Sequence, residues 1–320
     1  MLVLSVLIMV SGGIVYGEDA QVSASYLYTL SNFTGIYPIS WAKLDADPTM
    51  DEVYVLSSAK IKIFDETGME VYSFNEFGEL GMVTDIAVDS KGEIIVLSYR
   101  AQTGSSEIIR CNFRGEPIST IGLKGLPAEY AGFVPNRIVI RGASFYLANT
   151  VEMKVVVTDD TGAFQKSYDL AAIIDKEMEQ EQLNEKDMAK EREDRGITGF
   201  AVDKEGNIFF TNGVLARVYC ISSEGQMRAF GQRGSTAGKF GVVGDIAIDA
   251  TGKYLFVADV LRCVVLVFDK NFRFYTEFGL YGNKPSNLIG PMYLAVDGKN
   301  RIYVSQLRNR GVNVYQMSAS

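Results

Sequence analysis

The chain has 320 residues, of which 47% are hydrophobic and 11% aromatic, and it carries a formal net charge of −8. This composition can build a large apolar core and excludes a disordered chain, while the negative charge disfavours DNA or RNA as the main partner. The sequence contains no histidine, which excludes a histidine general base and a histidine-ligated zinc.

Residues 1–17 form an apolar, uncharged leader that is followed at once by Glu18 and Asp19. The segment resembles a secretory signal peptide that is cleaved after Gly17, although the usual basic residues before the apolar run are missing. An uncleaved membrane anchor is the alternative. We therefore expect a periplasmic or secreted protein whose mature part, residues 18–320, is a single domain.

After the leader, residues 25–33 (SYLYTLSNF) alternate apolar and polar side chains and predict a β-strand. The segment resembles the strands that end several later repeats, yet it precedes the first of them. The last repeat correspondingly stops after its third strand. We expect the N-terminal strand to supply the missing fourth strand and so to join the two ends of the chain.

One unit repeats along the rest of the chain, and residues 244–279 show it most clearly. Four short apolar strands are separated by tight turns, of which the first has an Asp that can bond backbone N–H groups and a Gly that permits a positive φ. Copies recur at intervals in the forties, and we place them at residues 38–78, 82–122, 134–170, 196–231, 242–279 and 290–317. Such a sheet cannot bury both faces alone. The repeats predict an all-β fold, a six-bladed β-propeller with four antiparallel strands in each blade.

Residues 171–195 interrupt the repeats between the third and fourth units. The segment has no Gly or Pro and is rich in Glu, Lys and Met, so it predicts a charged helical insertion. Its place in the repeat puts it on the same face as the loops that join second to third strands. The helix either contributes to a binding surface there or is simply solvated.

The three cysteines, Cys111, Cys220 and Cys263, fall in or beside third strands of different units. Their spacing matches neither a disulfide framework nor a metal-binding CxxC pair. We expect buried thiols.

The repeats resemble the NHL-repeat family of six-bladed propellers. The likeness covers about residues 25–317 and is strongest in FGQRGSTAGKFGVVGDIAID (230–249) and YLFVADVLRCVVLVFD (254–269). The family pattern has an Asp at the end of the second strand, then an Asn and an Arg, of which this chain keeps Asp259, Asn309 and Arg217 in different units. Most members are binding platforms. A minority are enzymes, and the peptidyl-amidating lyases among them use histidine ligands that this chain lacks.

A metal site in the central channel is one possible centre of chemistry. The first strands begin with polar residues that should point to the axis, and Asp85, Asn136 and Asp245 could together hold a hard cation such as Ca²⁺. Metal-dependent lactonases of similar shape use a comparable set, but their Glu has no counterpart here. The alternative is that the two carboxylates bond backbone amides.

A ring of cations on one rim is the second candidate. Every unit has basic residues in or beside the loop between its second and third strands, namely Lys60, Arg100, Lys154, Arg217, Arg262, Arg308 and Arg310. These could bind an anionic polymer or RNA. The alternative is that they form ion pairs between blades, each contributing only ~0–1 kcal/mol.

Together these features predict a monomeric, exported binding or scaffolding module rather than an enzyme. Its partner would be a protein or an anionic polymer of the cell envelope, bound through the face that carries the basic loops and the charged helix. A metal-dependent hydrolase or lactonase is the first alternative, and a polyanion- or RNA-binding protein is the second. Calcium in the channel is the only cofactor that the sequence suggests.

Overall fold

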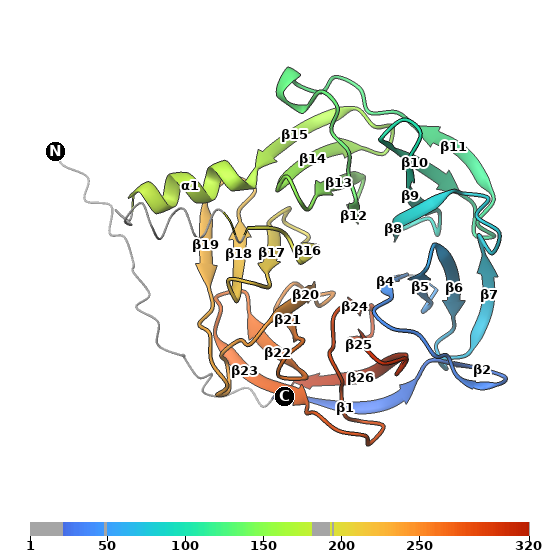
Figure 1. Ribbon diagram of the computed structural model, residues 1–320, viewed down its shortest axis with the longest axis vertical. Helices are drawn as coiled ribbons and strands as arrows, with labels where there is room; N and C mark the ends of the chain where they lie inside the picture. The colour runs from blue at the N-terminus through green and yellow to red at the C-terminus, as the bar shows by residue number, and fades with distance from the viewer. Residues whose placement is uncertain (1–21, 48–49, 181–192, 194, 320) are drawn as a thin grey trace.

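The computed structural model describes residues 22–47, 50–180, 193 and 195–319. Six four-stranded antiparallel sheets stand around a central axis, as predicted (Figure 1). The chain is a six-bladed β-propeller. The leader at 1–17 and residues 181–192 and 194 of the predicted helix lie outside the described residues. Within the described part, no helix is long and apolar enough to cross a membrane.

The first three blades follow the chain from the innermost strand outward. Blade 1 consists of β4 (Lys43–Ala46), β5 (Val53–Ser57), β6 (Lys60–Phe64) and β7 (Glu70–Phe74). Blade 2 consists of β8 (Met82–Val88), β9 (Ile94–Arg100), β10 (Ser105–Cys111) and β11 (Pro117–Ile121). After the short 3-10 helix η1 (Ala128–Tyr130), blade 3 consists of β12 (Arg137–Arg141), β13 (Ser144–Asn149), β14 (Lys154–Asp159) and β15 (Phe164–Asp169).

The last three blades follow helix α1 (Leu170–Gln180). Blade 4 consists of β16 (Gly199–Val202), β17 (Ile208–Asn212), β18 (Arg217–Ile221) and β19 (Met227–Phe230). Blade 5 consists of β20 (Val243–Ile248), β21 (Tyr254–Asp259), β22 (Val264–Asp269) and β23 (Phe274–Gly279). Blade 6 consists of β24 (Leu294–Val296), β25 (Arg301–Ser305), β26 (Val312–Ala319) and, on the outside, β1 (Val22–Thr29).

Strand β1 closes the ring. It pairs antiparallel with β26, with Tyr26 opposite Tyr315, and it lies at the outer edge of blade 6 (Figure 1). The predicted strand at 25–33 was placed too late, because the chain turns at Leu30, whose side chain is buried. Beyond it, β2 (Ser31–Asn32) and β3 (Gly35–Ile36) form a small hairpin with Phe33 exposed near its tip.

The predicted Asp turns form in blades 2, 4, 5 and 6, whereas Asp45 of blade 1 lies within strand β4 and bonds the N–H of Val88 in blade 2. In the turn between the first and second strands of blade 2, Asp89 accepts hydrogen bonds from the backbone N–H groups of Lys91 and Glu93, and Gly92 has a φ of 74°. The same bonding recurs in blades 4, 5 and 6 at Asp203, Asp249 and Asp297. The face of the ring on which these turns lie is called the turn face below. The opposite face, which carries the loops between second and third strands, is called the loop face.

The core lies between the blades. The described residues form six hydrophobic clusters, and each is shared by two neighbouring blades. Phe209 and Phe268, for example, belong to the cluster between blades 4 and 5. Each fully buried side chain of this size contributes about 1.5–3 kcal/mol. All three cysteines are buried and unpaired, as expected.

Helix α1 begins at the end of blade 3 and packs over the junction with blade 4 (Figure 1). Asp169 accepts a hydrogen bond from the N–H of Ala172 and so caps the first turn. Leu170, Ile174 and Met178, spaced four residues apart, are buried in the cluster between the two blades. The described part of the insertion is therefore an amphipathic helix with one buried face, not a freely solvated one.

Candidate functional site

The innermost strands β4, β8, β12, β16, β20 and β24 surround the central channel (Figure 1). Each has one free edge, so alternate N–H groups have no partner within their own blade. Carboxylates from neighbouring blades bind several of them. Asp85 accepts from the N–H of Ile138 at 2.8 Å, and Asp245 accepts from the N–H groups of Phe200 and Leu294 at 3.2 and 3.4 Å. This is the structural role that the alternative interpretation predicts for the two aspartates.

Two cations lie against the same carboxylates. Arg137 Nε is 3.5 Å from Asp85 Oδ2, and Arg137 Nη2 is 3.5 Å from Asp245 Oδ1. Lys43 Nζ lies 3.6 Å from Asp85 Oδ1 and donates to the carbonyl oxygen of Thr84 at 2.6 Å. The four side chains join blades 1, 2, 3 and 5 across the axis, and we call them the axial ion cluster.

Burial and charge act against each other in the axial ion cluster. Burial would lower the pKa of Arg137, but Asp85 and Asp245 offset it and the pKa lies above its ordinary value. Burial raises the pKa of Asp245 despite the nearby Arg137, and it lowers the pKa of Lys43 despite Asp85. The two positive and two negative groups largely neutralise one another.

The structure brings Asp85 and Asp245 together but gives Asn136 a different role. The Asn136 amide donates to Thr150 Oγ1 and accepts from the Thr150 N–H, at 2.9 and 3.1 Å. Among the described residues, no group of three Asp, Glu, Cys or His side chains is arranged to hold a metal ion. The calcium site stays a prediction. The geometry does not favour it, because the cations of Lys43 and Arg137 lie where a bound metal ion would have to compete for the carboxylates.

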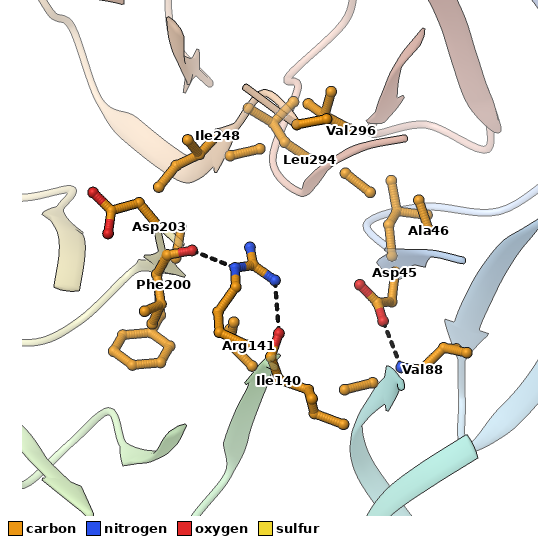
Figure 2. Close-up of a pocket in the computed structure, with 18 of the residues that line it drawn as sticks. Asp45, Ala46, Val88, Ile140, Arg141, Phe200, Asp203, Ile248, Leu294 and Val296 are labelled. Atoms are coloured by element: carbon orange, nitrogen blue, oxygen red, sulfur yellow. Dashed lines mark hydrogen bonds between the residues drawn. The ribbon is translucent and has the colours of Figure 1, made fainter. Parts of the chain in front are cut away.

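Between the axial ion cluster, which forms one end of it, and the turn face, the channel contains a cavity of about 360 Å³. Figure 2 shows Asp45 and Arg141 on different walls of this cavity. Asp45 accepts from the N–H of Val88 at 2.8 Å. Burial raises the pKa of Asp45 to about 7, although the Val88 N–H and Arg141 oppose the change. Burial also lowers the pKa of Arg141, while Asp45 and Asp203 oppose this.

The predicted ring of cations is largely neutralised by partners in the same blade. Lys60 lies 2.8 Å from Glu76, Arg100 2.7 Å from Glu107, Lys154 3.5 Å from Glu152, and Arg262 2.6 Å from Glu277. Arg310 donates to backbone carbonyl groups of residues 283, 284 and 287. Arg217 and Arg308 are exposed. The ring is thus built mainly from ion pairs within blades, where the sequence predicted pairs between blades or a free cationic rim.

The residues at the ends of the second strands hold the loops in place. Asp259 accepts from the N–H groups of Gly241, Val242 and Arg262 at 2.6, 3.2 and 2.9 Å. Gln306 accepts from the N–H of Ile289 at 3.0 Å in the equivalent place. In this chain, the residue at this position of the repeat therefore has a structural role, because it binds the backbone of the adjoining loops.

Apolar side chains are exposed on the loop face of three consecutive blades. Val151, Val214 and Leu261 stand at equivalent positions, two residues after the last residue of the second strand. They are 83%, 57% and 69% exposed. Trp41, on the same face, is 42% exposed and donates from its indole nitrogen to the carbonyl oxygen of Gly290 at 2.9 Å.

Comparisons with solved structures find proteins that share the β-propeller architecture of this chain. No protein-family model and no curated protein matches this sequence. A solved streptogramin B lyase superposes with a TM-score of 0.58 at 10% identity, over 93% of this chain and 98% of that one. A Bacteroides thetaiotaomicron protein of unknown function gives 0.62 at 10% identity, over 94% and 77% of the two chains. What they share with this chain is the fold.

A catalytically inactive virginiamycin B lyase from Staphylococcus aureus, solved with quinupristin, is a further neighbour. It gives a TM-score of 0.54 at 14% identity, over 93% of this chain and 99% of that one. At such identities the likeness again concerns the propeller alone.

Four charged residues of the channel were not predicted, namely Lys43, Asp45, Arg137 and Arg141. The sequences of the first strands nevertheless contain a signal for these residues. The first strands of the other four blades have an alanine at their centre, as in DIAVD and GFAVD, whereas KLDA and RIVIR put charges into an otherwise apolar strand. A charge at an innermost strand position has only the channel or a neighbouring blade to face.

Proposed function

We propose that this chain is an exported propeller of the NHL-repeat type that binds a protein of the cell envelope through its loop face and catalyses no reaction itself. The exposed aliphatic side chains Val151, Val214 and Leu261 carry the proposal. Single exposed apolar residues are common on protein surfaces. Three at the same position of consecutive repeats form a pattern that folding does not require, because the loops are already held by their own hydrogen bonds.

The chemistry of the loop face favours a partly apolar partner over a polyanion. Five of the seven predicted cations are engaged by carboxylates or carbonyl groups, and among the described residues Arg217 and Arg308 have no such partner. A nucleic acid or anionic polysaccharide would need several unpaired cations. A protein surface with aliphatic side chains and a few carboxylates matches what is exposed here.

A hydrolase or lyase has less support. The carboxylates of Asp85 and Asp245 are already engaged by backbone N–H groups and by Arg137. The inactive virginiamycin B lyase carries a histidine-to-alanine substitution, and this chain has no histidine to take such a role. The shared propeller therefore brings no catalytic residue with it.

Site-specific photo-crosslinking in the native envelope tests the proposal. A crosslinking amino acid at position 214 or 261 should capture one defined partner, whereas the same amino acid at the exposed turn-face positions 71 and 113 should not. The triple variant Val151→Asp, Val214→Asp, Leu261→Asp should weaken capture at least about tenfold. Equal capture from both faces, or capture unaffected by the three aspartates, would contradict a docking site on the loop face.

A further inference from the structure

The part of the central channel nearer the turn face has the properties of a ligand site that is separate from the loop face. Its volume of about 360 Å³ falls within the range of small-molecule pockets, which is about 300–1,000 Å³. The alanines at the centres of four innermost strands, Ala87, Ala201, Ala247 and Ala295, all line the cavity, and their small side chains are buried in the clusters between blades. The axial ion cluster crosses the channel at the end of the cavity that is nearer the loop face, so a ligand would enter from the turn face.

Arg141 supplies a fixed cationic wall. Its Nε donates to the carbonyl oxygen of Val202 at 2.6 Å, and its Nη1 donates to that of Ile140 at 2.8 Å. These carbonyls orient the guanidinium without cancelling its charge. In the part of the chain that the structure describes, no carboxylate lies within ion-pair distance of Arg141. Its side chain is exposed to the channel, and Figure 2 shows it reaching into the cavity.

Asp45 supplies an acidic wall. One of its oxygens accepts from the N–H of Val88, and the carboxyl group faces the cavity (Figure 2). Among the described residues it forms no ion pair, with Arg141 or with any other cation. An acid and a base thus face one cavity without meeting, although a direct ion pair would be the simplest way to satisfy both.

We propose that this cavity binds a small zwitterion of the α-amino acid class, with its carboxylate on Arg141 and its ammonium group toward Asp45. A guanidinium fork binds a carboxylate through charge-assisted hydrogen bonds. Such a ligand neutralises both walls at once and adds no net charge to the channel.

The opening of the cavity disfavours a simple anion. Asp203, Asp249 and Asp297 lie in the turns that line it, together with Lys204, and Asp297 is paired with Arg301. The remaining carboxylates, Asp203 and Asp249, outweigh Lys204, so they repel an approaching anion and attract an ammonium group. A simple cation, in contrast, is repelled by the positive charge of Arg141. A ligand that carries both charges satisfies both conditions.

Calorimetric titration of the purified protein with glycine, L-alanine, acetate and methylammonium at pH 7.5 tests the proposal. We expect saturable binding of the two amino acids, and affinities at least about tenfold lower for acetate and methylammonium. Arg141→Gln and Asp45→Asn should each weaken amino acid binding at least about tenfold. Arg228→Gln, which removes an exposed arginine from the outer strand of blade 4, is the matched control and should bind as the wild type does.

Three results would overturn the proposal: no heat of binding from either amino acid up to about 20 mM, acetate binding as tightly as glycine, or unchanged binding by Arg141→Gln. If Arg141→Gln does not fold, Arg141→Lys replaces it, since the lysine keeps the charge and loses the fork. Amino acid binding by Arg141→Lys at wild-type affinity would equally contradict the assigned role. The loop-face variants leave this cavity intact, so the outcome is independent of the proposed function.

Discussion

At the scale of single residues, Asp45 makes stability depend on pH. Its pKa is raised from the ordinary 3.8 to about 7, so the folded protein holds a proton that the unfolded chain releases between these values. The free energy of unfolding must therefore fall as the pH rises through this window. Asp45→Asn keeps an acceptor for the Val88 N–H without the charge.

We expect Asp45→Asn to be more stable than the wild type by about 1–2 kcal/mol at pH 8, a value reduced because water reaches the channel. The difference should shrink steadily toward pH 4. Urea denaturation at several pH values measures it, with Asp160→Asn, at a half-buried carboxylate outside the channel, as the control variant. A pH-independent difference for Asp45→Asn would show that the carboxyl is not held protonated.

Asp259 and Gln306 occupy the same position in successive blades but hold different numbers of N–H groups. Asp259→Ala leaves three N–H groups, one buried and two partly buried, without their acceptor, whereas Gln306→Ala leaves one that is buried. We expect losses of about 3 and 1 kcal/mol in the free energy of unfolding. Chemical denaturation of the two variants measures them. Equal losses would mean that water replaces the Asp259 carboxylate, and the loop would then not depend on it.

At the scale of elements, Ile174 fixes helix α1 to the ring. It is 2% exposed between Leu170 and Met178, and Arg195 adds a 2.9 Å ion pair to Asp175. Ile174→Ala should cost about 2 kcal/mol or more locally. Hydrogen exchange of residues 170–180 should accelerate, while Lys176→Ala on the exposed side should not change it. Unchanged exchange in Ile174→Ala would show that α1 does not depend on this contact.

The individual elements also show which structural features can be predicted from the sequence. Alternating apolar residues and Asp–Gly turns predicted the blades, because those signals are local to one repeat. The four-residue spacing of Leu170, Ile174 and Met178 was equally local, yet the many charges around it hid the buried face. The partners of Asp85 could not be read from the sequence, because the Ile138 N–H that it binds becomes available only when the neighbouring blade presents its free edge.

At the scale of the whole molecule, the N-terminal strand holds the ring closed. Without β1, strand β26 would expose its outer edge, and Tyr315 would lose its edge-on contact with Tyr26, whose ring centre lies 5.8 Å away. Deleting residues 22–29 should lower the free energy of unfolding by about 3 kcal/mol or more and should promote association through the open edge.

A circular permutant tests whether the pairing of β1 with β26 stabilises the ring regardless of where β1 lies in the chain. A short linker from residue 319 to residue 22, with new ends in the exposed turn at residues 101–104, retains every pair between β1 and β26. We expect this permutant to unfold cooperatively near the wild-type denaturant midpoint and to remain monomeric in sedimentation, unlike the deletion variant. If the deletion variant were as stable as the permutant, the ring would be held by the packing between blades alone, and pairing of the two chain ends would contribute nothing to it.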